Sequence, residues 1–121
     1  MDPDAVEYEL SRILTLIGAR DRAAFLERIG PLLDDARARP TIIEVIGSLG
    51  LKGGLPRLEP LIENRDLTQE DAVRLACALG EIGGTEACAL LDRMERATPA
   101  ERTAVLDEIG IARNAARRAT G

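Results

Sequence analysis

The fold is decided by one stretch of the chain, Thr68-Gln-Glu-Asp-Ala-Val-Arg-Leu-Ala-Cys-Ala-Leu-Gly-Glu-Ile-Gly-Gly-Thr-Glu-Ala-Cys-Ala-Leu-Leu91. Its apolar residues recur at the spacing of a helix face, first at Val73, Ala76, Leu79 and Ile82, then at Ala87, Leu90 and Leu91. Thr68 stands where a hydroxyl caps a helix start, and Gly83 stands where a left-handed residue closes a helix. The stretch therefore predicts two helices joined by a tight turn.

The same kind of unit recurs along the chain, because an isoleucine–glycine or leucine–glycine pair closes an apolar, helix-periodic run four times. The pairs are Ile17-Gly18, Leu49-Gly50, Ile82-Gly83 and Ile109-Gly110. Their spacings of 32, 33 and 27 residues are typical of helical hairpins that stack on one another. We expect each pair to end a helix, and we expect the last unit to be contracted.

Helix starts are expected at caps and prolines. Thr41 and Thr98 are each followed three residues later by glutamate, as in a capping box. Thr85 is expected to cap the second helix of the deciding stretch, and Asp2-Pro3 to begin the first helix of the chain. Pro31 interrupts a helical stripe whose phase continues beyond it, which predicts a kink rather than an end.

The first helix is expected to bury one apolar face, made of Val6, Leu10, Ile13, Leu14 and Ile17. The last segment, from Ile111 to Gly121, offers mainly alanine for burial and is expected to fray or to be ordered by another chain. Linkers between the units are short, so the 121 residues are expected to form a single domain. Its units cover approximately residues 2–38, 41–64, 68–97 and 98–119.

Composition excludes several classes of function. The net charge of −5 disfavours binding to nucleic acid, which needs a surplus of Lys and Arg. The chain has no His, so neither a general base that titrates near neutral pH nor a zinc site can be assembled. Cys77 and Cys88 are interpreted as small buried apolar residues. We expect no enzyme activity, no cofactor and no metal.

No apolar run is long enough to span a membrane, and no secretory signal is visible at the N-terminus. The sequence therefore predicts no membrane partner, and the expected location is the cytoplasm. Aromatic residues make up only 2% of the chain, so the core must be built from Leu, Ile, Val and Ala. That composition favours close-packed helices over a β-sandwich.

The segment Ala72 to Leu91 resembles the HEAT-like repeat of the phycobilisome-lyase type. The matching positions are Ala72, Val73, Arg74, Leu79, Gly80, Ile82 and Gly83, whereas Gly84 stands where the motif usually has aspartate. The resemblance implies an all-α fold, a short right-handed α-solenoid of about 3.5 helical hairpins with seven or eight helices. It also implies that the second helices of the hairpins line the face that binds partners.

Charged residues of the expected second helices are therefore candidates for partner binding: Arg22, Glu27, Arg28, Arg57, Glu59, Glu63, Glu86, Arg93 and Arg96. The C-terminal arginines Arg113, Arg117 and Arg118 either provide favourable charge at a helix end or dock to an acidic partner.

The leading hypothesis for function is a non-enzymatic protein-interaction scaffold, an adaptor or regulatory subunit in a bacterial cell. A first alternative, implied by the resemblance alone, is a bilin lyase-type subunit or a chaperone of bilin proteins. A second alternative is a scaffold that forms homo-oligomers through an end repeat, because terminal repeats of a solenoid leave a face uncovered.

Overall fold

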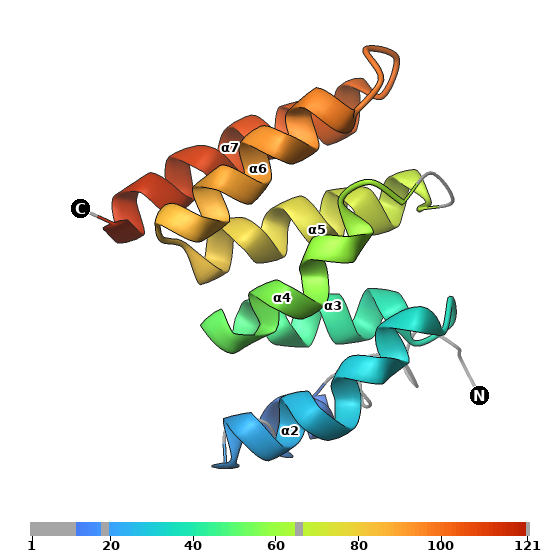
Figure 1. Cartoon of the computed structure of the whole chain (residues 1–121), viewed down its shortest axis with the longest axis vertical. Helices are drawn as coiled ribbons and strands as arrows, with labels where there is room; N and C mark the ends of the chain where they lie inside the picture. Colours follow the sequence, from blue (N-terminus) through green and yellow to red (C-terminus); the bar gives the residue numbers. More distant parts are fainter. Residues whose placement is uncertain (1–11, 18–19, 65–66, 121) are drawn as a thin grey trace.

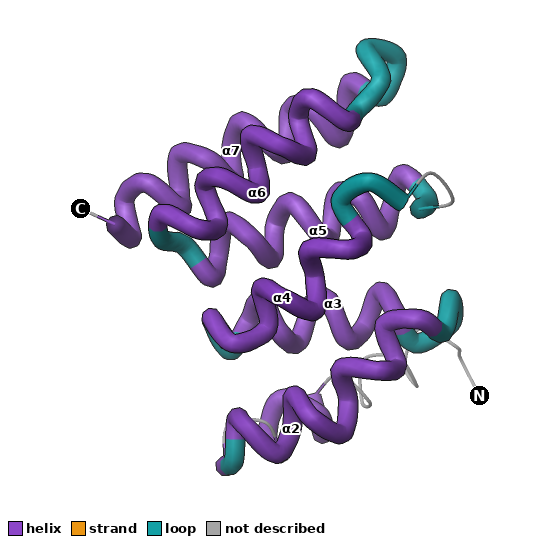
Figure 2. The backbone as a smooth tube through the Cα atoms, viewed as in Figure 1, coloured by secondary structure: helices purple, strands orange, loops and turns teal. Residues whose placement is uncertain are grey.

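The computed structural model describes residues 12–17, 20–64 and 67–120, and within these ranges it contains helices and no strands. The predicted all-α fold is thereby confirmed. Residues 12–17 are helical, and the later elements are α2 (Arg22–Ile29), η1 (Gly30–Asp34), α3 (Arg39–Ser48), η2 (Lys52–Gly54), α4 (Leu55–Leu58), η3 (Glu59–Leu61), α5 (Gln69–Ile82), α6 (Thr85–Ala97) and α7 (Thr103–Thr120) (Figure 2).

The helices form two layers. α3, α5 and α7 lie side by side in that order, with extensive packing of α5 against both neighbours. α2, α4 and α6 lie in front of them in the view of Figure 1, and α6 packs on α5 and α7. We call these the α3–α5–α7 layer and the α2–α4–α6 layer. Among these six helices, α3, α5 and α7 correspond to predicted first helices of hairpins and share one layer, whereas the second-helix elements α2, α4 and α6 share the other.

Small residues bring the long helices together. A Cβ built on Gly47 of α3 would lie 2.7 Å from the Cα of Ala78 in α5, far closer than real Cβ atoms approach. Gly80 of α5 meets Ala112 of α7 in the same way. Because neither glycine carries a side chain, the backbones approach closely enough for the flanking leucines and isoleucines to interlock.

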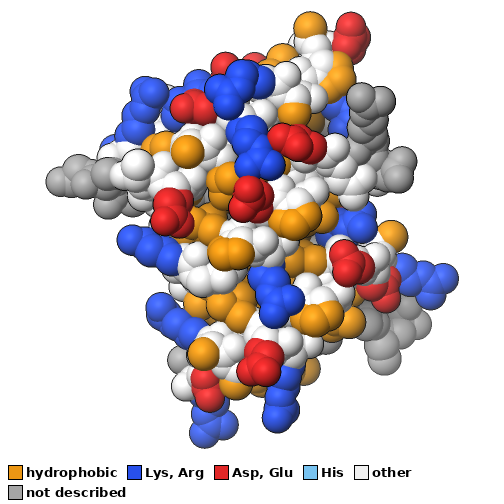
Figure 3. Space-filling view, in the orientation of Figure 1, with side chains coloured by type: hydrophobic (Ala, Val, Ile, Leu, Met, Phe, Trp, Pro, Cys, Tyr) orange, Lys and Arg blue, Asp and Glu red, His pale blue; other side chains and the backbone are white. Residues whose placement is uncertain are grey.

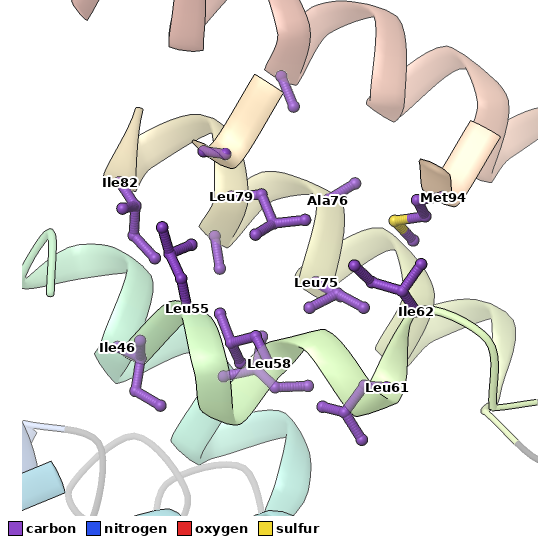
Figure 4. Packing of buried hydrophobic residues seen from close by; sticks show 14 of the residues in the cluster. Ile46, Leu55, Leu58, Leu61, Ile62, Leu75, Ala76, Leu79, Ile82 and Met94 are labelled. Atoms are coloured by element: carbon purple, nitrogen blue, oxygen red, sulfur yellow. The ribbon is translucent and has the colours of Figure 1, made fainter. Parts of the chain in front are cut away.

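The core lies between the two layers and consists of aliphatic side chains, with Phe25 as its one aromatic residue in the described ranges. Figure 4 shows Leu58 of α4 with Leu75 and Leu79 of α5 in this core, and all three are fully buried. Each such side chain contributes on the order of 1.5–3 kcal/mol by leaving water.

The predicted helix ends are confirmed in part. Gly50 and Gly83 follow α3 and α5 with φ of +60° and +69°, which is the left-handed backbone that glycine tolerates. Gly110 contradicts its prediction, because it lies inside α7, and the contracted last unit is a single helix. α7 also continues past Ile111, because Ala112 and Ala116 are small enough to be buried against its neighbours. The pair Ile17-Gly18 extends outside the described residues.

Of the predicted helix starts, the structure confirms the one at Thr68 and contradicts those at Thr41 and Thr98. Thr68 caps α5 as expected, its hydroxyl accepting from the Asp71 amide at 3.0 Å. The prediction that Thr41 caps a helix is wrong. α3 begins upstream at Arg39 with Pro40 in its first turn, which leaves Thr41 buried inside the helix. The prediction that Thr98 caps the start of a helix is also wrong, because Thr98 lies at the end of α6. Its hydroxyl donates to the carbonyl of Met94 at 2.7 Å. Thr85 is the first residue of α6 and makes no capping bond.

The N-terminal part departs from the predicted burial. Ile13 and Ile17 are 47% and 53% exposed, and Leu14 is only partly buried, so none of the three described residues of the expected apolar face is fully buried. Val6, Leu10 and Asp2-Pro3 lie outside the described residues. At Pro31 the α-helix ends rather than only bending: α2 stops at Ile29, and the chain continues directly into the tighter turn of η1, which holds Pro31 near its start.

Candidate functional site

The predicted partner-binding residues fall on the expected elements but do not form one cluster. The first nine lie on α2, α4, η3 and α6 or just after η3, and Arg113, Arg117 and Arg118 lie on α7. Hydrogen bonds and ion pairs divide the twelve into residues that are bonded within the fold and residues whose charge remains available.

Arg93 belongs to the first group. Its Nη1 donates to Glu59 at 2.8 Å and its Nε donates to Glu63 at 2.9 Å, so α6 is tied to the η3 region. These two hydrogen bonds raise the pKa of Arg93 above its ordinary value. Three of the predicted contact residues are therefore engaged with one another, and a partner would have to displace these bonds to use them.

Arg113 is likewise engaged, in ion pairs with Asp92 at 3.0 Å and Glu95 at 2.9 Å that join α7 to α6. Its hydrogen bond with Glu95 raises its pKa, and partial burial opposes that rise. The Nε of Arg113 is buried without an acceptor, which is consistent with a side chain held by the fold. Arg118 donates from Nε to the carbonyl of Asn114 in its own helix at 3.4 Å.

The second group is exposed and makes no ion pair or side-chain hydrogen bond within the described part of the chain. Its members are Arg22, Glu27, Arg28, Arg57, Glu86, Arg96 and Arg117. Arg57 extends over the preceding element, since its Nε would lie 2.8 Å from a Cβ built on Gly30. On the α2–α4–α6 layer, charges of both signs therefore face solvent.

A groove between α4 and α6 gives this layer an apolar contact surface. Its volume is about 250 Å³, and its lining consists of the apolar residues Leu55, Pro56, Ala89 and Leu90 together with Glu59 and Glu86. Figure 3 shows this face of the molecule, where apolar side chains lie between separate charged residues. We call this the α4–α6 groove. Sequence reasoning found Glu59 and Glu86 but missed the groove, because exposure of Pro56 and Ala89 depends on how the two elements pack.

The opposite layer carries a different groove of about 330 Å³, lined by Glu44, Val73, Cys77, Glu81 and Glu108 among others. Cys77 is exposed, which contradicts the prediction that it is buried, and Cys88 is partly buried. The thiol of Cys77 donates to Glu81 at 3.3 Å. Partial burial of the thiol, followed by this hydrogen bond and by the nearby charges of Glu81 and other carboxylates, raises the pKa of Cys77 to about 11. It is therefore a poor nucleophile at neutral pH.

Within the described residues, no group of three or more Asp, Glu, Cys or His side chains is placed to hold a metal ion. None of the helices in these ranges combines the length and apolar character that a membrane crossing needs. No protein-family model matches the chain, and no curated protein or solved structure is detectably similar to it.

Proposed function

We propose that the chain is a non-enzymatic protein-interaction module, a short HEAT-like solenoid whose α2–α4–α6 layer receives a segment of a partner protein. The observation that carries the proposal is the α4–α6 groove, where apolar side chains meet carboxylates on an exposed face. Interfaces of this kind combine an apolar centre with a polar rim.

The charges beside the groove favour a partner segment with apolar side chains and at least one Lys or Arg. Glu86 is exposed and without a partner in the described residues, so a cation would gain an ion pair there without breaking an existing one. Glu59 is already bound by Arg93 and would contribute less. Exposed ion pairs are screened by salt, so binding should weaken as ionic strength rises.

Peptide display on the immobilised full-length chain tests the proposal and does not require the partner itself. Selection should enrich peptides that carry apolar residues with Lys or Arg, and these should fail to bind an Ala89→Arg variant, in which a bulky cation fills the groove. Ala104→Arg is the matched control, because Ala104 is also an exposed helical alanine but lies on α7. Enriched peptides that bind Ala89→Arg as well as the parent chain would contradict the proposal.

Self-association is a second candidate, favoured by apolar side chains left exposed at the two ends of the helix stack. Ile13, Leu16 and Ile17 are 47–59% exposed near one end, and Ile111 is 62% exposed on α7 at the other (Figure 1). Light scattering over a range of concentrations should then report a mass above that of the monomer, and Leu16→Glu should lower it. A monomeric mass at all concentrations would exclude this candidate and leave the partner-binding proposal untouched.

A further inference from the structure

A third and larger hollow lies at the end of the layers where α5 and α7 begin. Its volume is about 620 Å³, within the range of roughly 300–1,000 Å³ that is usual for small-molecule pockets. Its apolar lining comes from Ile62, Leu67, Ala72, Met94 and Val105, which are buried residues of four different segments. Figure 4 shows two of these side chains, Ile62 and Met94, on the same side of α5.

The polar side chains that line this hollow differ in whether another residue already occupies them. Glu63 is bound by Arg93, and the Thr98 hydroxyl donates to the Met94 carbonyl. Arg102 is the only cation among the lining residues, and it has no ion pair within the described part of the chain.

Arg102 is also held in place. Its Nη1 donates to the carbonyl of Leu67 at 3.1 Å, which fixes the partly buried guanidinium beside the apolar lining. One hydrogen bond leaves most of the five guanidinium N–H groups available, and their planar fork matches the two oxygens of a carboxylate. The pocket thus offers one anchored cation in a cavity that is lined by both polar and apolar residues.

We propose that this hollow binds a small amphiphilic monocarboxylate, with its apolar body against the exposed lining residues Ala97 and Pro99 and its carboxylate on Arg102. The proposal does not depend on the α4–α6 groove: of the residues that line the groove, none lines this hollow. A single carboxylate fits because Arg102 is the one cation among the described lining residues, and an uncharged body fits because most of the other residues in that lining are apolar.

Titration of the ¹⁵N-labelled full-length chain with dodecanoate, below the concentration at which it forms micelles, tests the proposal. Saturable shifts are expected at the amides of Leu67, Ala72 and Val105. Dodecanol has the same apolar body without the charge, so it should bind more weakly. No saturable shifts, or shifts at unrelated positions, would overturn the proposal.

Arg102→Gln should weaken dodecanoate binding by about tenfold or more, the usual effect of losing a hydrogen bond to a charged group, and should leave dodecanol binding unchanged. Arg96→Gln is the matched control, because Arg96 is an exposed cation nearby in sequence that does not line the hollow. Ala97→Trp provides a second variant that keeps the Arg102 bond and fills the hollow from an exposed lining position. Equal losses in Arg96→Gln and Arg102→Gln, or full affinity in Ala97→Trp, would overturn the proposal.

Discussion

Gly80 of α5 lies directly against the backbone of Ala112 in α7. A Cβ built on Gly80 would lie 2.8 Å from the Cα and 2.9 Å from the Cβ of Ala112. Gly47 and Ala78 make the equivalent contact between α3 and α5, about one repeat earlier in the chain. The spacing of the α3–α5–α7 layer is therefore set by the same glycine–alanine contact twice.

Replacing Gly80 with alanine should lower the free energy of unfolding by about 1–3 kcal/mol, because the added methyl group would overpack a contact made by backbone atoms. Gly110→Ala is the matched control inside α7, where an added Cβ meets nothing within 4 Å. That change should raise stability by roughly 0.5–1 kcal/mol through helix propensity. Denaturant unfolding of both variants measures the difference, and a Gly80→Ala protein as stable as the parent would contradict the close contact.

Removing the hydroxyl of Thr68 should cost about 1 kcal/mol of stability, because the Asp71 amide would lose its capping partner. Thr85 begins α6 without making a capping bond. Thr85→Ala should therefore change stability by no more than about 0.5 kcal/mol, as expected for a surface substitution. Thermal unfolding of the two variants side by side would show whether the caps differ in this way.

Reversing the charge of Arg93 should lower the melting temperature, because a new carboxylate would lie beside Glu59 and Glu63. Adding Glu63→Arg to Arg93→Glu should restore part of the loss by remaking one ion pair in the opposite sense. Arg96→Glu serves as control, since Arg96 is exposed and has no ion pair within the described residues. The differences should shrink at high salt. An equal drop in melting temperature for Arg93→Glu and Arg96→Glu would argue against a stabilising role for the ion pairs of Arg93 with Glu59 and Glu63.

Alkylation of Cys77 by iodoacetamide should stay slow at neutral pH and accelerate up to about pH 11, because only the thiolate reacts and the pKa of the thiol is raised to about 11. A Cys88→Ala background isolates the signal for mass spectrometry. Glu81→Gln should lower the pKa of Cys77 and speed the reaction near pH 8, since it removes a charge that opposes ionisation. A rate that levels off below pH 9 would show that the thiol is not shifted.

Much of the fold follows from the sequence because local signals and packing agree there. The hydroxyl of Thr68 suits the position before a helix, and the positive φ that glycine tolerates suits Gly50 and Gly83 after a helix. Each of these residues occupies the predicted position. The prediction that Gly110 ends a helix is wrong, because the sequence alone does not distinguish a glycine inside a helix from a glycine that follows one. The long-range packing of Ala112 and Ala116 is what carries α7 through it.

The candidate site was predicted less well, for a reason visible at Arg93. Sequence places Arg93, Glu59 and Glu63 on second helices, but it does not show that they satisfy one another across two elements. The α4–α6 groove and the hollow beside Arg102 also arise from side chains far apart in sequence. Exposed charge can be read from a helical pattern, whereas charge that remains unpaired can be read only from packing.

We propose that the α4–α6 groove is the surface that binds a partner protein. The dissociation constant of one display-selected peptide for the parent chain, Ala89→Arg and Ala104→Arg tests this proposal. We predict that Ala89→Arg weakens binding by at least about tenfold, as expected when the apolar centre of an interface is blocked, and that Ala104→Arg leaves it unchanged. The same dissociation constant for all three proteins would contradict the claim.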